Sequence, residues 1–109
     1  MMNKTFIRGA TFDLSGAVTV LDRGVRILNL TGWSVTSQIR TKTGLVLIQS
    51  LVCSWVDPTQ SLVRVMCPTT TVLWTLGDAM MDIALTSPTG DVVFTKPVQF
   101  EIEESVTRL

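Results

Sequence analysis

Apolar and polar residues alternate along several short segments of the chain, and residues 33–40 show this pattern most clearly. Trp33, Val35 and Ile39 fall at alternate positions of this segment, and most of the residues between them are polar. Successive side chains of a β-strand point to opposite faces, so this spacing predicts a strand that is buried on one side and solvated on the other.

Turn-forming residues separate such segments at intervals of about ten residues, which is typical of an antiparallel β-sandwich or barrel. The turn signals include Gly9, Gly16, Gly24, Gly32, Gly44, Pro58, Gly77 and Gly90. The strands expected between them span residues 4–7, 11–21, 25–28, 33–40, 45–56, 61–66, 79–86 and 92–103. A chain of 109 residues with this rhythm is expected to form one all-β domain over residues 1–109.

Two places depart from the strand pattern. Residues 69–75 lie between Pro68 and Gly77, and we expect a short helical turn there that crosses the end of the sandwich. Pro97 interrupts the last expected strand, because proline has no amide hydrogen for a sheet ladder. It therefore predicts an edge position or a bulge.

Residues 45–56 are apolar on both faces of the expected strand. One face carries Leu47, Leu51, Cys53 and Trp55. The other face carries Ile48, Val52 and Val56. A strand with two apolar faces is either buried on both sides or in contact with a partner. Ile48, Val52 and Val56 are thus the candidate subunit interface, and the alternative is a long strand that crosses from one sheet to the other.

Composition supports an interface, because 46% of the residues are hydrophobic and only 17% are charged, with a mean hydropathy of +0.40. A small domain has little interior, so the apolar surplus is expected either on a surface shared with another protein or as scattered exposed residues.

Charge and hydropathy also argue against several partners. Nine basic and nine acidic residues cancel, and the absence of a basic run gives no support for nucleic-acid binding. No apolar stretch approaches the ~20 residues that span a bilayer. The first residues contain no apolar signal segment, so we expect a protein of the cytoplasm, or of a particle assembled there, without membrane contact.

No catalytic or metal-binding set stands out in the sequence. The chain has no histidine, and thirteen residues separate Cys53 from Cys67, a spacing that matches no zinc motif. Asp57, Asp78 and Asp91 fall at turns, where aspartate serves the backbone. We therefore expect a protein without enzymatic activity and without a metal or cofactor.

The two cysteines are expected on neighbouring strands joined by a turn at Asp57 and Pro58. In the register that this turn favours, Cys53 lies opposite Val65, so that Cys67 is its diagonal neighbour. A bridge is conceivable at that distance, but in a reducing compartment two buried thiols are the expectation.

Short motifs that occur in order along almost the whole chain carry a family resemblance. They are Arg8-Gly9-Ala10-Thr11-Phe12, Asn29-Leu30-Thr31-Gly32-Trp33, Gln38-Ile39-Arg40, Asp57-Pro58, Thr71 to Gly77, Asp82-Ile83, Ser87 to Gly90 and Val106-Thr107. Together they resemble small β-sandwich proteins of tailed bacteriophages and prophages, which are similar to the N-terminal domain of baseplate upper proteins. Asn29 and Ala10 depart from the pattern, which often has aspartate at both positions.

The resemblance implies an immunoglobulin-like β-sandwich of about seven to eight strands. It also implies a non-enzymatic structural protein of the virion, an adaptor in the tail, baseplate, neck or fibre attachment region. Its partners would be other phage virion proteins and further copies of itself.

Three alternatives remain open at this stage. A capsid decoration protein would have the same composition. A receptor- or carbohydrate-binding module would expose at least two of Trp33, Trp55 and Trp74 on one surface, whereas the competing expectation places all three in the core. A small hydrolase would bring two carboxylates together in a cleft.

Overall fold

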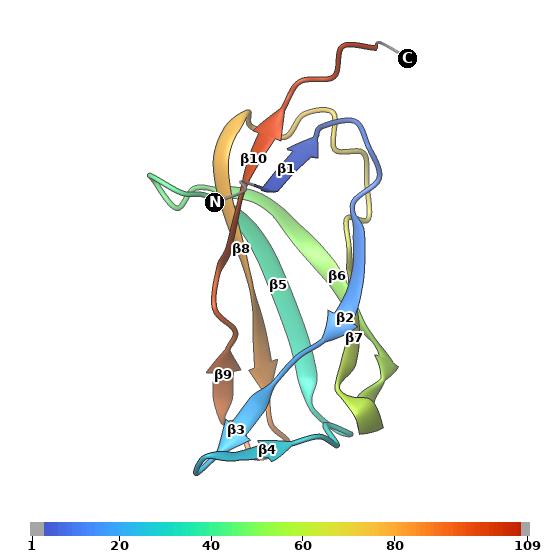
Figure 1. Ribbon diagram of the computed structural model, residues 1–109, viewed down its shortest axis with the longest axis vertical. Helices are drawn as coiled ribbons and strands as arrows, with labels where there is room; N and C mark the ends of the chain where they lie inside the picture. The colour runs from blue at the N-terminus through green and yellow to red at the C-terminus, as the bar shows by residue number, and fades with distance from the viewer. Residues whose placement is uncertain (1–3, 108–109) are drawn as a thin grey trace.

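The computed structural model describes residues 4–107, and within them the protein is all-β, as predicted (Figure 1). One short 3-10 helix, Pro58–Gln60, is the only helix of the described residues. The strands are β1 (Lys4–Ile7), β2 (Asp13–Ala17), β3 (Val20–Asp22), β4 (Val25–Ile27), β5 (Ser34–Thr41), β6 (Leu47–Asp57), β7 (Leu62–Met66), β8 (Gly77–Thr86), β9 (Val92–Phe94) and β10 (Val98–Glu103).

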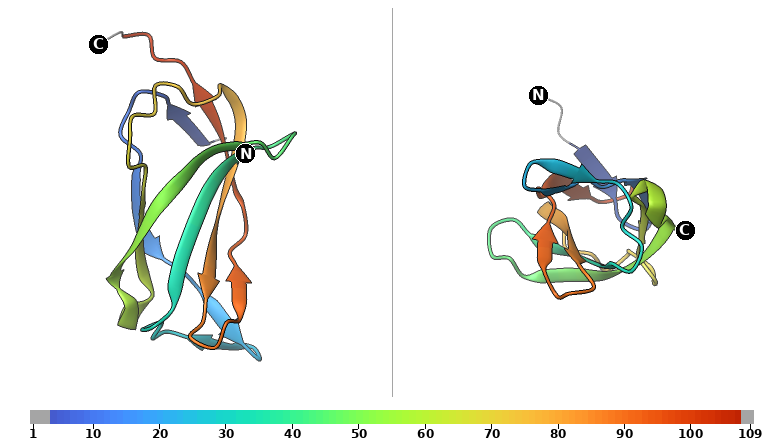
Figure 2. Two further views of the ribbon diagram at one scale, coloured as in Figure 1. Left: turned by 180° about the vertical axis from the view of Figure 1, so that it is seen from behind. Right: turned by 90° about the horizontal axis from the view of Figure 1, so that it is seen from below.

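The strands form a β-sandwich in which one continuous path of hydrogen-bonded neighbours curls round on itself (Figure 2). The order is β1-β10-β8-β5-β6-β7-β2, and β9 pairs with the far part of β8. The long strand β6 belongs to both layers, because it pairs with β5 over its first part and with β7 over its second. All these pairings are antiparallel except that of β1 with β10. A separate hairpin of β3 and β4 lies across one end (Figure 1).

Strand β5 has the two-sided character that its sequence predicts. Ser37 and Ile39 are buried and Val35 is half-buried, whereas Ser34 and Thr36 on the opposite face are exposed. Ser37 is polar, but its hydroxyl donates to the backbone oxygen of Asp82 on β8 (2.6 Å), so the buried face contains a satisfied polar group.

The hairpin of β6 and β7 confirms the predicted register. Cys53 lies opposite Val65, and the turn begins at Asp57, whose carboxylate caps the short 3-10 helix by accepting the amide hydrogen of Thr59 (3.0 Å). Both cysteines are free thiols. Cys67 is buried and Cys53 half-buried, and burial raises the pKa of the Cys53 thiol.

The helical turn predicted for residues 69–75 is wrong. This segment is an irregular loop with one backbone turn, in which the Trp74 amide donates to the Thr71 oxygen (3.1 Å). The Thr71 hydroxyl accepts the Gly9 amide hydrogen (2.7 Å) and donates to the Ala10 oxygen (2.8 Å). These distant bonds, together with the burial of Trp74, replace the local bonds of a helix, for which consecutive threonines have low propensity.

Two of the expected strands are divided in the structure. Residues 11–21 form β2 and β3, with a break after Ala17. Residues 92–103 form β9 and β10 on either side of Pro97, as the missing amide hydrogen predicts.

The buried side chains form two clusters, one toward each end of the molecule. The first, which we call the aromatic cluster, contains Phe12, Ile39, Leu51, Val65, Cys67, Trp74, Ala79, Met81 and Ile102, with Phe6, Ile48, Cys53, Ile83 and Phe100 packed against it. The second, the aliphatic cluster, contains Val18, Val20, Leu30, Val63 and Leu85, with Ile27, Trp33, Val35, Trp55, Ile83 and Val93 packed against it. Ile83 contacts both clusters and so links them into one core.

Candidate functional site: the exposed apolar surface

The three residues of the sequence-predicted interface do not share one face. Val52 and Val56 are 47% and 57% exposed on the outer side of β6, whereas Ile48 packs against the aromatic cluster. A β-bulge causes the difference, because Ile39 pairs with Gln49 and its neighbour Arg40 pairs with Leu47. Ile48 is the extra residue of the bulge.

The bulge reverses the faces predicted for the start of this strand. Leu47, expected beside Leu51 in the core, is 45% exposed, and Ile48 packs inward in its place, while Gln49 stays on the same face as Leu51. The amide oxygen of Gln49 accepts the indole N–H of Trp74 (3.3 Å). The faces predicted for this strand are therefore wrong at its first two residues, Leu47 and Ile48.

Val52 and Val56 lie among polar neighbours on the outer face. Ser54 lies between them on β6, and its partner on β7 is Arg64. Arg64 forms a bidentate pair with Asp13 on β2, with its Nε and Nη2 at 2.9 and 2.6 Å from the two carboxylate oxygens. The hydrogen bond from Arg64, aided by its charge, holds the pKa of Asp13 below its ordinary value. Two valines on such a face make a small apolar contact area.

Other apolar side chains are exposed at the edges and ends of the sandwich. Besides Val56, those more than half exposed are Leu21, Val25, Leu45, Val46, Leu73, Val92, Phe94 and Val106. Sequence reasoning did not single out most of them, because an apolar residue in a turn or an edge strand has the same one-letter pattern as a buried one.

One hollow of about 390 Å³ lies on the outer face of β5 and β8. It is lined by Gln38, Arg40, Leu45, Met80, Met81, Asp82, Phe94 and Pro97. The rim carries Leu45 and Phe94, which are 57% and 65% exposed. Arg40 is already engaged, since it donates to the Leu45 backbone oxygen (2.9 Å) and to the Gln38 side chain (2.8 Å). The hollow thus combines the apolar side chains of Leu45 and Phe94 with the Arg40 guanidinium, which is hydrogen-bonded to neighbouring groups of the same chain.

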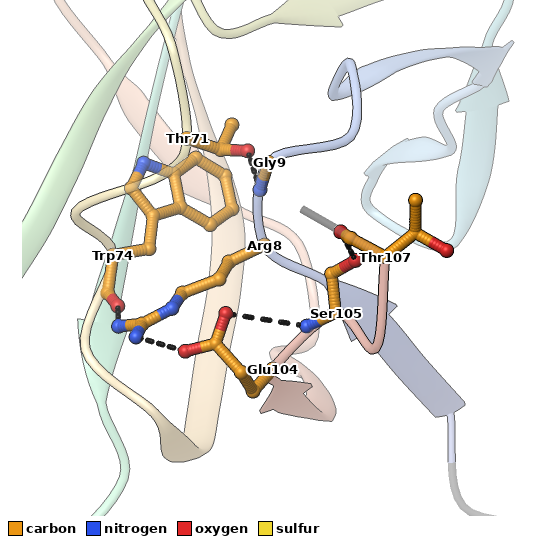
Figure 3. Close-up of polar contacts among 7 residues, drawn as sticks. All are labelled: Arg8, Gly9, Thr71, Trp74, Glu104, Ser105 and Thr107. Atoms are coloured by element: carbon orange, nitrogen blue, oxygen red, sulfur yellow. Dashed lines mark hydrogen bonds and ion pairs between the residues drawn. The ribbon is translucent and has the colours of Figure 1, made fainter. Parts of the chain in front are cut away.

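A second hollow of about 440 Å³ lies where the residues after β1 meet the C-terminal segment, and Arg8 is among its lining residues. Arg8 donates to the Trp74 backbone oxygen (2.9 Å) and forms an ion pair with Glu104 (Figure 3). The Arg8 Nε is buried without a hydrogen-bond partner among the described residues. This arrangement fastens the N-terminal strand to the last one, which is a structural role for Arg8.

The tryptophans do not form an exposed row. Trp74 is 3% exposed, and Trp33 and Trp55 are half-buried against the aliphatic cluster. The indole N–H of Trp55 donates to the Trp33 backbone oxygen (2.9 Å). This placement agrees with the core expectation and gives no stacking platform for a sugar.

The acidic residues are likewise dispersed. Within residues 4–107 no group of three or more His, Cys, Asp or Glu side chains is placed to hold a metal ion. Asp13 pairs with Arg64, Asp57 caps the 3-10 helix, and Asp91 lies in the hairpin after β8. No helix in this described part of the chain has the length and apolar character needed to cross a membrane.

Comparison with known proteins bears on the fold. No family model and no curated protein matches the chain. Among solved structures, the crystal structure of CopC from Methylosinus trichosporium OB3b is similar, with a TM-score of 0.54 and 11% sequence identity. The match covers 98% of this chain and 89% of that one. A likeness at this identity concerns the β fold and not the function.

Proposed function

We propose that this protein is a non-enzymatic structural protein of a bacteriophage virion, which acts as an assembly adaptor in the tail, baseplate, neck or fibre attachment region. The observation that carries the proposal is the exposed apolar surface, which includes Phe94 on an edge strand at 65% exposure and Leu73 in a loop at 90%. Aromatic residues such as phenylalanine are enriched at surfaces that bind other proteins. The ordered motifs of the sequence give the bacteriophage context.

The architecture suits an adaptor because the exposed apolar residues lie in several separate places on one rigid sandwich. Val52 and Val56 lie on an outer face, Leu45 and Phe94 at a hollow, and Leu73 in the loop before β8. A subunit with several contact areas can bind copies of itself through one and a different virion protein through another. In a ring, symmetry repeats each small contact many times, so a modest area per subunit is sufficient.

Purified particles provide the test. Phage particles from a strain that carries this gene would be banded on a density gradient, and their proteins quantified by mass spectrometry. The proposal expects the chain at a fixed ratio to the major tail or capsid protein, whereas an abundant host protein serves as the control for contamination. Particles that contain every other structural protein of the phage but not this chain would contradict the proposal.

The same particles separate an adaptor from the alternative of a capsid decoration protein. Gold-labelled antibodies against the chain would mark the tail, baseplate or neck of an intact particle if it is an adaptor. Uniform labelling of the head would replace the adaptor role with that of a decoration protein.

A further inference from the structure

Strand β2 is an open edge of the sandwich. It pairs with β7 on one side, and on its other side no strand of the described residues is hydrogen-bonded to it. All five residues of β2 are exposed, and for Gly16 this exposure is that of the backbone itself. An open edge of this kind presents unpaired amide and carbonyl groups to a further strand.

The phase of the β2–β7 ladder shows which groups are free. The Cys67 amide donates to the Phe12 oxygen (3.0 Å), and the Val18 amide donates to the Ser61 oxygen (2.9 Å). In an antiparallel ladder the backbone groups of alternate residues bond to the same neighbour. The even-numbered residues therefore bond to β7, and Asp13, Ser15 and Ala17 direct their N–H and C=O groups away from the sheet.

The other edges carry features that discourage pairing, and β2 does not. Lys96 and Pro97 lie just beyond the short edge strand β9, separated from it by Thr95, and Lys4 begins β1. Lysine and proline are the residues by which natural edges avoid association. The one charge on β2, that of Asp13, is already neutralised by Arg64 of the same chain.

We propose that two copies of this chain pair edge to edge through β2, antiparallel about a two-fold axis at Ser15. In this register Ser15 lies opposite Ser15 of the second copy, and Asp13 lies opposite Ala17. The backbone N–H and C=O groups of Asp13, Ser15 and Ala17 point away from β7 toward the second copy. Each opposed pair of these residues can therefore exchange two hydrogen bonds. No charged residue faces a like charge.

The side chains on the other face of β2 fit the same register. Leu14, which is 50% exposed, lies opposite Gly16 of the second copy. A Cβ atom built at Gly16 meets nothing within 4 Å, so there is space beside this backbone. Pairing therefore covers Leu14 and places it over a residue with no side chain, and a glycine inside a strand often marks the close approach of a second backbone. A contact of this two-fold kind closes at two copies.

The pairing rests on the proposed function, since it names the contact between copies that an adaptor uses, but its test is independent of the virion. Ser15→Cys places two cysteines opposite each other at a Cα separation of about 5.5 Å. This lies within the range of roughly 4.4–6.8 Å that a disulfide spans. Mild oxidation is expected to convert most of this variant to a covalent dimer.

Two controls make the cross-linking result specific. Thr36→Cys places a cysteine at an exposed position on the central strand β5, which cannot approach its own copy edge to edge. The unsubstituted chain measures the background from Cys53 and Cys67. A dimer yield for Ser15→Cys no higher than for Thr36→Cys would overturn the pairing.

A second variant tests the pairing without a covalent bond. Ser15→Glu faces Arg64 within its own chain, which stabilises the monomer, but it faces a second glutamate across the axis. Native mass spectrometry and sedimentation are expected to show at least a tenfold weaker dimer than for the conservative Ser15→Thr. Equal affinity of the two variants would contradict the pairing.

The outcomes of the two proposals can be told apart. If the chain forms this dimer but is missing from virions, the proposed function is rejected and the pairing stands.

Discussion

The two ends of the sandwich are held together in different ways. At the aromatic cluster, the rings of Phe6, Phe12 and Trp74 lie with centroids 5.1 to 5.4 Å apart. These residues come from β1, the segment before β2, and the loop after β7, so the cluster joins parts of the chain that are far apart in sequence. At the other end, the aliphatic cluster is built around Leu30, Leu85 and Val20, and it contains no phenylalanine.

Each end also contains one buried hydroxyl that connects two segments. At the aromatic end, Thr71 is 1% exposed and binds the backbone of Gly9 and Ala10. At the aliphatic end, Ser61 is fully buried and donates to the Leu28 backbone oxygen. Contacts among aromatic rings join distant segments at one end, whereas valine and leucine side chains with two tryptophans packed against them form the other. Both ends also contain a buried hydroxyl that bonds to a distant backbone.

The largest effect is expected at the aromatic end, from Trp74→Ala. Removing the indole leaves a cavity among Phe6 and Phe12 and leaves Gln49 without its hydrogen bond, so we expect a loss of about 3–5 kcal/mol in the free energy of unfolding. Urea denaturation measures it. Leu73→Ala, at a neighbouring position that is 90% exposed, is the matched control and is expected to change the value by less than about 0.5 kcal/mol. Equal losses for the two variants would refute the role of the aromatic cluster.

Leu85→Ala tests the aliphatic end. Leu85 is fully buried, and its truncation is expected to lower the free energy of unfolding by about 2–5 kcal/mol. Val92→Ala, on the neighbouring strand β9 but 53% exposed, is the control. Hydrogen exchange compares the two ends within the same variant. Leu85→Ala is expected to reduce amide protection in the β3–β4 hairpin more than in β1. A larger reduction in β1 would contradict the division into two ends.

The buried hydroxyls give a smaller effect. Thr71→Val and Ser61→Ala each leave part-buried backbone groups without these partners, at an expected cost of roughly 1–3 kcal/mol. Ser61 also has φ = 57°, in the left-handed region that favours glycine. Ser61→Gly is therefore expected to lose less stability than Ser61→Ala in the same urea titration. If Ser61→Ala were more stable than Ser61→Gly, the left-handed backbone conformation at this position would not account for the difference in stability.

The smallest effect is expected on the outer face, at the exposed pair of Asp13 and Arg64. The pKa of Asp13 in the folded protein is lower than its ordinary value of 3.8, so the pair stabilises the fold above that value and ceases to do so as pH falls through the lowered pKa. Arg64→Gln should therefore reduce stability slightly at neutral pH and by progressively less as the pH falls below 3.8. Denaturation midpoints measured from neutral pH into this acidic range follow the difference, and an equal decrease at every pH would exclude this electrostatic origin.

The paired strands β5, β6 and β7 were more predictable from the sequence than the loop and the bulge at the aromatic end. Alternation identified β5 and its inward residues Val35 and Ile39, and the turn at Asp57 gave the register of β6 and β7. These features depend on local spacing, which the sequence contains. The fold class followed from the same spacing and from the regular turns.

The remaining features depend on contacts between distant residues. The position of the Thr71 segment between Pro68 and Gly77 suggested a helical turn, but bonds to Gly9 and Ala10 determine its conformation. A bulge at Ile48 moves that residue into the core, and nothing in the alternation of β6 marks where the extra residue falls. The open edge of β2 could not be predicted either, because strand order is a property of the whole sheet.

Light scattering on the purified chain, across a wide range of protein concentration, tests most directly whether the exposed surface and the open edge serve assembly. The account predicts a mass that rises from one chain to a defined multiple of it, with two chains as the first step. A mass of one chain at every concentration would contradict self-association as the purpose of these surfaces.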